Sequence, residues 1–135
     1  MRKVICSPKD GWGPILREAL LVAALIGIPL LASAAGDAAR GEQLYEARCS
    51  ACHSLDANRI GPLHRGVFGR RAGSITDYDY SPAVKRSSIV WSEKTLERWL
   101  ADPERTIPGQ KMAYQVSDSA DRADVIAFLK RESGK

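Results

Sequence analysis

The sequence predicts an all-α domain with four helices and long loops. Apolar residues recur at helical spacing in four separate stretches, and no stretch alternates as a half-buried strand would. The segment from Ser54 to Ser88 is poor in large apolar residues and rich in glycine, which is typical of loops. A chain of 135 residues has room for one such domain.

The N-terminal part resembles an export signal rather than a part of this domain. A basic leader precedes the uncharged run from Ala19 to Ala35, which contains the small-residue sequence Ala32-Ser33-Ala34. We therefore expect residues 1–34 to be a signal peptide and residues 35–135 to form the functional domain in the periplasm. The alternative is an uncleaved membrane anchor, because the run of 17 residues reaches the lower limit for spanning a bilayer.

The composition of residues 35–135 limits the classes of function. This part holds 16 basic and 14 acidic residues, a net charge of about +2, and no dense basic stripe. Nucleic acid is therefore not an expected partner. Because Cys6 lies in the leader, the domain keeps only Cys49 and Cys52. In an oxidising compartment these two would pair, unless something else consumes both thiols.

The first two helices are predicted from their starting residues. The first extends from about Asp37 to Ala51, with Asp37 as its N-cap and Leu44, Arg48 and Ala51 at helical spacing. A short second helix begins at Ser81, because the Ser-Pro pair supplies an N-cap and a proline at the first helical position.

The last two helices carry clearer apolar faces. One begins at Ser92 and ends before Pro103, with Leu96, Trp99 and Leu100 on one face. The other begins around residues 117–119. Its apolar stripe contains Val125, Ile126, Phe128 and Leu129.

The motif CSACH, residues 49–53, has three chemical interpretations. A redox dithiol usually belongs to a βαβ unit, and this sequence offers no strands. A structural zinc site needs four ligands. The domain could supply them only by using His64 and both of the adjacent residues Cys52 and His53, which would be strained.

Covalent haem attachment fits the motif better. Two cysteines three residues apart on a helical turn project to the same side, so both sulfurs can reach the two vinyl groups of one porphyrin edge. The next residue, His53, then faces the iron. The thioether bonds would also consume both thiols of an exported protein.

The residue on the other side of the iron decides whether small ligands can bind there. Met112 lies in the polar loop IPGQKMAY, and a thioether sulfur is a good ligand for haem iron. A methionine that merely fills a gap in the core is the alternative for Met112. His64, 11 residues after His53, competes for the same position, although a loop histidine with a hydrogen bond to the backbone is favoured.

Several motifs together resemble class I c-type cytochromes of the mitochondrial and bacterial soluble type. The resemblance extends from about Gly36 to Lys130 and includes GEQLYEARCSACH, GPLHRGVFGRRAG, IPGQKM and RADVIAFL. It implies a small cytochrome c fold, about four helices and long loops around one covalently bound haem c with its iron. The implied cofactor-binding residues are Cys49, Cys52, His53, Pro62, Arg70, Tyr80, Trp91, Trp99 and Met112, with His53 and Met112 as the iron ligands.

The resemblance also assigns supporting roles. The Pro62 carbonyl would hold the His53 ring, and Arg70, Tyr80 and Trp91 would lie by the haem propionates. Trp99 takes a position near the methionine sulfur that a tyrosine often holds in the family.

A further role falls on the first helix. Gly41 and Tyr45 match the face of that helix that crosses the last helix near Phe128. A glycine at such a crossing permits the backbones to approach closely.

Three features depart from the family pattern. The interval from His53 to Pro62 is about three residues shorter than in the mitochondrial form. His64 stands where the family usually places an apolar residue beside the haem. The glycine that usually follows a few residues after the methionine is absent beyond Met112.

The expected function is that of a monomeric periplasmic one-electron carrier, not an enzyme. By resemblance, its redox partners are a cytochrome bc-type complex and a terminal oxidase or other reductase. Arg48, Lys85, Arg86 and Lys111 are candidates for a docking ring around the haem edge. The alternative functions are a haem subunit of a larger enzyme and a sensor or catalytic haem protein with a displaceable distal ligand.

Overall fold

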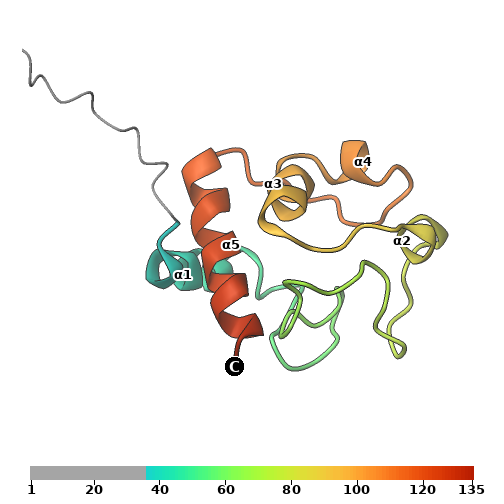
Figure 1. The fold of residues 1–135 in the computed structure, drawn as a ribbon, viewed down its shortest axis with the longest axis horizontal. Coiled ribbons are helices and arrows are strands. Elements are labelled where there is room, and N and C mark those ends of the chain that lie inside the picture. Colours follow the sequence, from blue (N-terminus) through green and yellow to red (C-terminus); the bar gives the residue numbers. More distant parts are fainter. Residues whose placement is uncertain (1–35) are drawn as a thin grey trace, which may run out of the picture. The chain divides into compact units, whose positions relative to one another are not determined.

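The computed structural model describes residues 36–135, and the expected signal peptide with Cys6 lies outside the described residues. The domain contains five helices (Figure 1): α1 (Ala38–Arg48), α2 (Pro82–Arg86), α3 (Glu93–Ala101), α4 (Pro103–Thr106) and α5 (Ser119–Ser133). Within the described residues, the only strand-like pairing is one isolated antiparallel bridge between Arg71 and Val90. No helix in this part is long and apolar enough to cross a bilayer. The all-α prediction is confirmed.

Side-chain caps start these helices where the sequence predicts them. The Asp37 carboxylate accepts hydrogen bonds from the backbone at the start of α1, and the Ser81 hydroxyl does the same for α2. Ser92 forms a capping box with Thr95 at α3. The short helix α4 was not predicted, although Asp102 and the following proline repeat the cap-and-proline signature of α2.

The first helix is shorter than predicted. It ends at Arg48 rather than Ala51. Its buried residues are Gly41 and Tyr45, whereas Leu44 is only partly buried and both Arg48 and Ala51 are exposed. The buried face is therefore the one that the resemblance implies for the crossing with the last helix.

The helices α1 and α5 cross with their backbones in close contact (Figure 1). A Cβ atom added at Gly41 would lie 2.0 Å from the carbonyl oxygen of Asp124, so only glycine fits there. One turn further along α1, the Tyr45 ring lies 5.0 Å from the Phe128 ring, centroid to centroid. This crossing holds the chain that leads into the CSACH motif.

A buried charge network reinforces the same crossing. Asp121 on α5 accepts hydrogen bonds from Arg40 and, at 2.8 Å, from Arg48. Asp124 binds Arg40 as well and accepts from the backbone N–H of Asp37 at 2.6 Å. Burial disfavours the ionised form of Asp121, but the hydrogen bonds from Arg48 and Arg40 outweigh it and hold the pKa of this carboxyl below its usual range.

Candidate functional site

The CSACH motif forms a helical turn directly after α1. The backbone N–H groups of Cys52 and His53 both donate to the carbonyl of Cys49, at 3.1 and 2.8 Å. Cys49 is partly buried and Cys52 is exposed, and both are free thiols. Burial raises the pKa of the Cys49 thiol to about 11. A redox-active cysteine has a lowered pKa, so this environment does not suit a catalytic dithiol.

The His53 ring is held by neighbours on several sides. Its Nδ1 lies 2.8 Å from the carbonyl oxygen of Pro62. Because a carbonyl only accepts, Nδ1 carries the proton and the lone pair of Nε2 is free to bind a metal. Gly61 packs so tightly that an added Cβ would lie 2.1 Å from Cε1 of this ring. The ring of His64 stacks on it, with the centroids 4.0 Å apart and the planes 17° from parallel.

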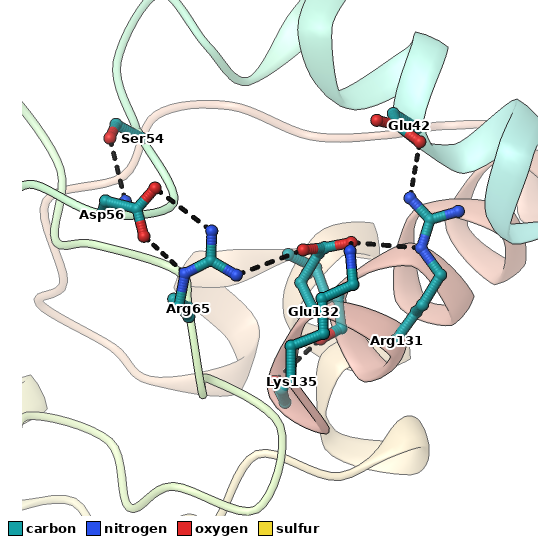
Figure 2. A network of polar contacts seen from close by, with 9 residues as sticks. Glu42, Ser54, Asp56, Arg65, Arg131, Glu132 and Lys135 are labelled. Atoms are coloured by element: carbon teal, nitrogen blue, oxygen red, sulfur yellow. Dashed lines mark hydrogen bonds and ion pairs between the residues drawn. The ribbon is translucent and has the colours of Figure 1, made fainter.

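The shortened loop after His53 is closed by backbone hydrogen bonds and an ion-pair chain. The N–H groups of His64 and Arg65 donate to the carbonyls of Ser54 and Leu55, both at 2.9 Å. The Arg65 guanidinium binds Asp56 within the loop and reaches Glu132 of α5 at 3.3 Å (Figure 2). The segment that carries the His53 contacts is therefore fixed to the last helix.

The far side of the same network ties the end of α5 to α1 (Figure 2). The buried Glu132 carboxylate also accepts from Arg131 at 3.1 Å and from Lys135 at 2.7 Å. Arg131 in turn binds Glu42 of α1 at 2.5 Å. Chiefly through the Lys135 hydrogen bond, this setting holds the pKa of Glu132 below its usual range.

Arg70 contacts the backbone that carries His64. Its guanidinium donates to the carbonyls of Leu63 and Arg65, each at 2.8 Å. The two carbonyls flank His64, so Arg70 fixes the position of that residue. The resemblance implies that Arg70 lies by the haem propionates. In the structure, Arg70 also binds the backbone on both sides of His64.

The loop that carries Met112 is anchored at both ends. Ile107 is buried at its start, and at its end the N–H of the buried residue Val116 donates to the carbonyl of Leu100 at 2.8 Å. Gly109 has a φ of +85°, which favours glycine in the turn before the methionine. Met112 is partly buried against the core and borders an open hollow of about 340 Å³.

Three predicted aromatic residues lie on or against the same core. Trp91 is buried, and its ring lies 5.3 Å from that of Trp99. Tyr80 is partly buried and contacts the Tyr78 ring edge-on at 4.7 Å. The structure thus packs Tyr80, Trp91, Trp99 and Met112 around one apolar core.

Sequence reasoning missed two of the contacts to His53. The Gly-Pro pair signals a turn, but nothing in the spacing shows that Gly61 touches the histidine ring. His64 stands out in the sequence as a polar residue at a usually apolar position. The structure stacks it on His53, a place that does not suit a ligand on the opposite side of the iron.

Comparisons with known proteins agree with this arrangement. A family model described as cytochrome c matches residues 38–132. A protein named cytochrome c from Cochliobolus lunatus is 43% identical over 102 residues, which cover 73% of this chain and 94% of that one. Cytochrome c2 of Rhodomicrobium vannielii is 38% identical over 120 residues, 83% of this chain and 95% of that one.

A solved structure shows the same fold. Cytochrome cH from Methylobacterium extorquens superposes with a TM-score of 0.68 at 43% sequence identity. The superposition covers 71% of this chain and 99% of that one.

Proposed function

Because the chain belongs to the cytochrome c family, we propose that it is a periplasmic one-electron carrier whose haem iron is bound by His53 and Met112. Members of this family are electron-transfer proteins, not enzymes, and they hold a covalently attached haem c with its iron. When bound, the haem supplies an iron that gains and loses one electron.

The attachment site is the turn formed by Cys49 and Cys52. Its two thiols are free, and its helical hydrogen bonds hold their backbones in a fixed relation. Two thioether bonds to one porphyrin edge need two cysteines on one turn of the chain, as Cys49 and Cys52 are here. The turn therefore supports haem attachment in addition to the motif.

The observation that carries the proposal is the setting of His53. Its Nδ1 proton is bound by the Pro62 carbonyl, which fixes the tautomer and leaves Nε2 to face a metal. Burial lowers the pKa of His53, which favours the neutral ring that binds iron. Gly61 lies against the His53 ring, so the ring has no room to rotate toward Gly61.

Met112 is the proposed second ligand. Its loop is anchored through Ile107 and Val116, and the side chain is directed at the core rather than fully exposed. Ligands held on such anchored segments move little between redox states, which keeps the reorganisation for electron transfer small. With both axial positions filled, the iron would have no open site for a substrate.

The proposed partners are a cytochrome bc-type complex as donor and a terminal oxidase or other reductase as acceptor. Of the four candidates for a docking ring, Lys85 and Lys111 both lie within ion-pair distance of Asp79, at 3.1 and 3.7 Å. Arg48 is engaged by Asp121 at the helix crossing. Because Lys85 and Lys111 share one exposed carboxylate, they lie close together on the surface, whereas the partner of Arg48 is buried. We therefore propose that Lys85 and Lys111 form part of the docking surface.

The proposed location follows from the leader. We propose that residues 1–34 are removed on export and that residues 35–135 work in the periplasm, with a retained anchor as the alternative. The measured N-terminus of the purified protein distinguishes the two.

Replacing the proposed distal ligand tests the function. Met112→Ala is expected to keep the haem attached, remove the near-infrared band of sulfur-bound ferric iron, lower the reduction potential and admit carbon monoxide at neutral pH. Tyr114→Ala, at an exposed position of the same loop, is the matched control and should retain the parent spectrum. A Met112→Ala variant with the parent's low-spin spectrum would show that another residue binds the iron.

A further inference from the structure

Two buried polar atoms in the described domain have no hydrogen-bond partner: the hydroxyl of Tyr45 and Nδ1 of His64. Leaving a buried donor or acceptor unpaired forfeits its hydrogen bond to water without replacement, so native proteins seldom do it. Both atoms belong to neighbouring rings, whose centroids lie 5.6 Å apart in an edge-on arrangement at 61°. Because the two rings are neighbours, each unpaired atom is the available hydrogen-bond partner of the other.

The two groups have complementary chemistry. A phenol O–H donates, and a neutral imidazole accepts at the nitrogen that bears no proton. Burial raises the pKa of Tyr45, so its hydroxyl keeps the proton and can donate it in a hydrogen bond. The cations that act on the two groups are engaged elsewhere, since Arg70 donates to backbone carbonyls and Arg59 donates to the carbonyl of Ser50 at 2.7 Å.

The neighbours of His64 give this pair a consequence for the site. The ring of His64 stacks on that of His53 at 4.0 Å, and its backbone is fixed by the hydrogen bond to Ser54 and by Arg70 on either side. The stack by itself does not fix which ring nitrogen faces Tyr45. A hydrogen bond to Nδ1 would fix it.

Resting on the proposed function, we infer that the Tyr45 hydroxyl donates a hydrogen bond to Nδ1 of His64, directly or through one buried water. The pair positions the ring of the axial ligand His53. In this arrangement His64 carries its proton on Nε2. His64 is a positioning residue that acts through His53, and Tyr45 fixes the orientation in which it does so.

The arrangement predicts a coupled effect on the reduction potential. A polar ring beside the site favours the more highly charged oxidised iron, and an apolar side chain favours the reduced state. His64→Leu is therefore expected to shift the potential upward. Tyr45→Phe is expected to raise the potential by a smaller amount. The Tyr45→Phe/His64→Leu double variant is expected to have the same potential as His64→Leu alone.

The direct test is nitrogen-15 NMR of the histidine rings in the reduced, diamagnetic holoprotein. The parent should show His64 as a single Nε2–H tautomer, and Tyr45→Phe should lose that single state or shift its Nδ1 resonance. Tyr114→Phe is the matched control, because it removes a phenol hydroxyl at an exposed position of another loop. An Nδ1–H tautomer in the parent, or identical His64 resonances in parent and Tyr45→Phe, overturns the inference.

A separate observable identifies a failure of the proposed function. If the oxidised parent lacks the near-infrared band of sulfur-bound iron, the proposed His53–Met112 ligation is wrong whatever the His64 tautomer. If the band is present and the tautomer is Nδ1–H, the ligation stands and the pair is rejected. Strictly additive potential shifts in the double variant would also reject the pair.

Discussion

The space beside a single ring decides whether His53 can serve as a ligand. Gly61 lies so close that any side chain there would displace the imidazole, since an added Cβ would be 2.1 Å from Cε1 and 2.6 Å from Nε2. The carbonyl of the next residue, Pro62, holds the other ring nitrogen. Two adjacent residues thus set both the position and the tautomer of this histidine.

Gly61→Ala tests this close packing. The added methyl group should displace the His53 ring, destabilise the fold by about 1–3 kcal/mol and weaken the low-spin spectrum of the holoprotein. Denaturant unfolding followed in parallel with the visible spectrum measures both effects.

Gly66→Ala provides the control for that substitution. Gly66 has a φ of +67° but open space around it, so alanine there should cost roughly 1–2 kcal/mol of backbone strain without changing the spectrum. Equal spectral changes in the two variants would contradict the assigned role of Gly61.

At the scale of elements, the crossing of α1 and α5 supports the attachment turn. The turn with Cys49 continues from the last residues of α1, and α1 is held against α5 by Gly41, by the ring contact of Tyr45 with Phe128, and by the Asp121 ion pairs. Substitutions at Gly41 and Asp121 should therefore affect folding first and the spectrum only through folding.

Gly41→Ala is expected to separate the two helices. Its Cβ would meet backbone atoms of Asp124 at 2.0 Å, and backbone cannot move aside as a flexible side chain can. We expect a loss of about 1–3 kcal/mol in the free energy of unfolding. Ala47→Gly, at an exposed position of the same helix, should cost only about 1 kcal/mol through helix propensity. Equal losses in the two variants would argue against a steric role for Gly41.

The ion pairs of Asp121 predict how stability depends on pH. Because the pKa of this carboxyl is lower in the folded than in the unfolded state, its contribution is complete above the unfolded pKa. It is lost as the pH falls through the folded pKa. Asp121→Asn should lower the urea midpoint at neutral pH and flatten its decline in acid. Exposed Asp77→Asn should leave both unchanged. If the urea midpoint of Asp121→Asn falls in acid as steeply as that of the parent, the ion pairs of Asp121 are not the source of the pH dependence.

At the scale of the whole molecule, the charge distribution affects how the protein associates with its redox partners and does not determine its fold. Residues 35–135 carry a net charge of only about +2, so any steering depends on where the charges lie. Reversing Lys85 and Lys111 to glutamate should slow oxidation by an acidic redox partner and weaken the dependence of the rate on salt. Stopped-flow rates at several ionic strengths measure this, with Lys94→Glu/Lys130→Glu as the control. Unchanged rates in the first pair would place the docking surface elsewhere.

The sequence predicted the helices well because their signals are local. Caps at Asp37, Ser81 and Ser92 and the stripe of the last helix depend on neighbours within one or two turns. The small cytochrome c fold implied by the motifs is confirmed by the family match and the shared fold. The end of α1 was predicted three residues too late, at Ala51 rather than Arg48, because a separate turn at Cys49 follows the helix.

Much of the site environment could not be predicted, because its contacts join segments that lie far apart in the sequence. The stacking of His64 on His53 and the Arg65 link to Glu132 join segments whose contact depends on the closed fold. The Pro62 contact was expected, but from the resemblance rather than from spacing. The ligand roles of His53 and Met112 stay predictions.

The most direct test is a redox titration of the purified holoprotein, followed in the visible and near-infrared. The account predicts one reversible one-electron transition, low-spin spectra in both states, and a near-infrared sulfur band that is present when oxidised and absent when reduced. A high-spin oxidised spectrum that binds carbon monoxide readily after reduction at neutral pH would contradict it.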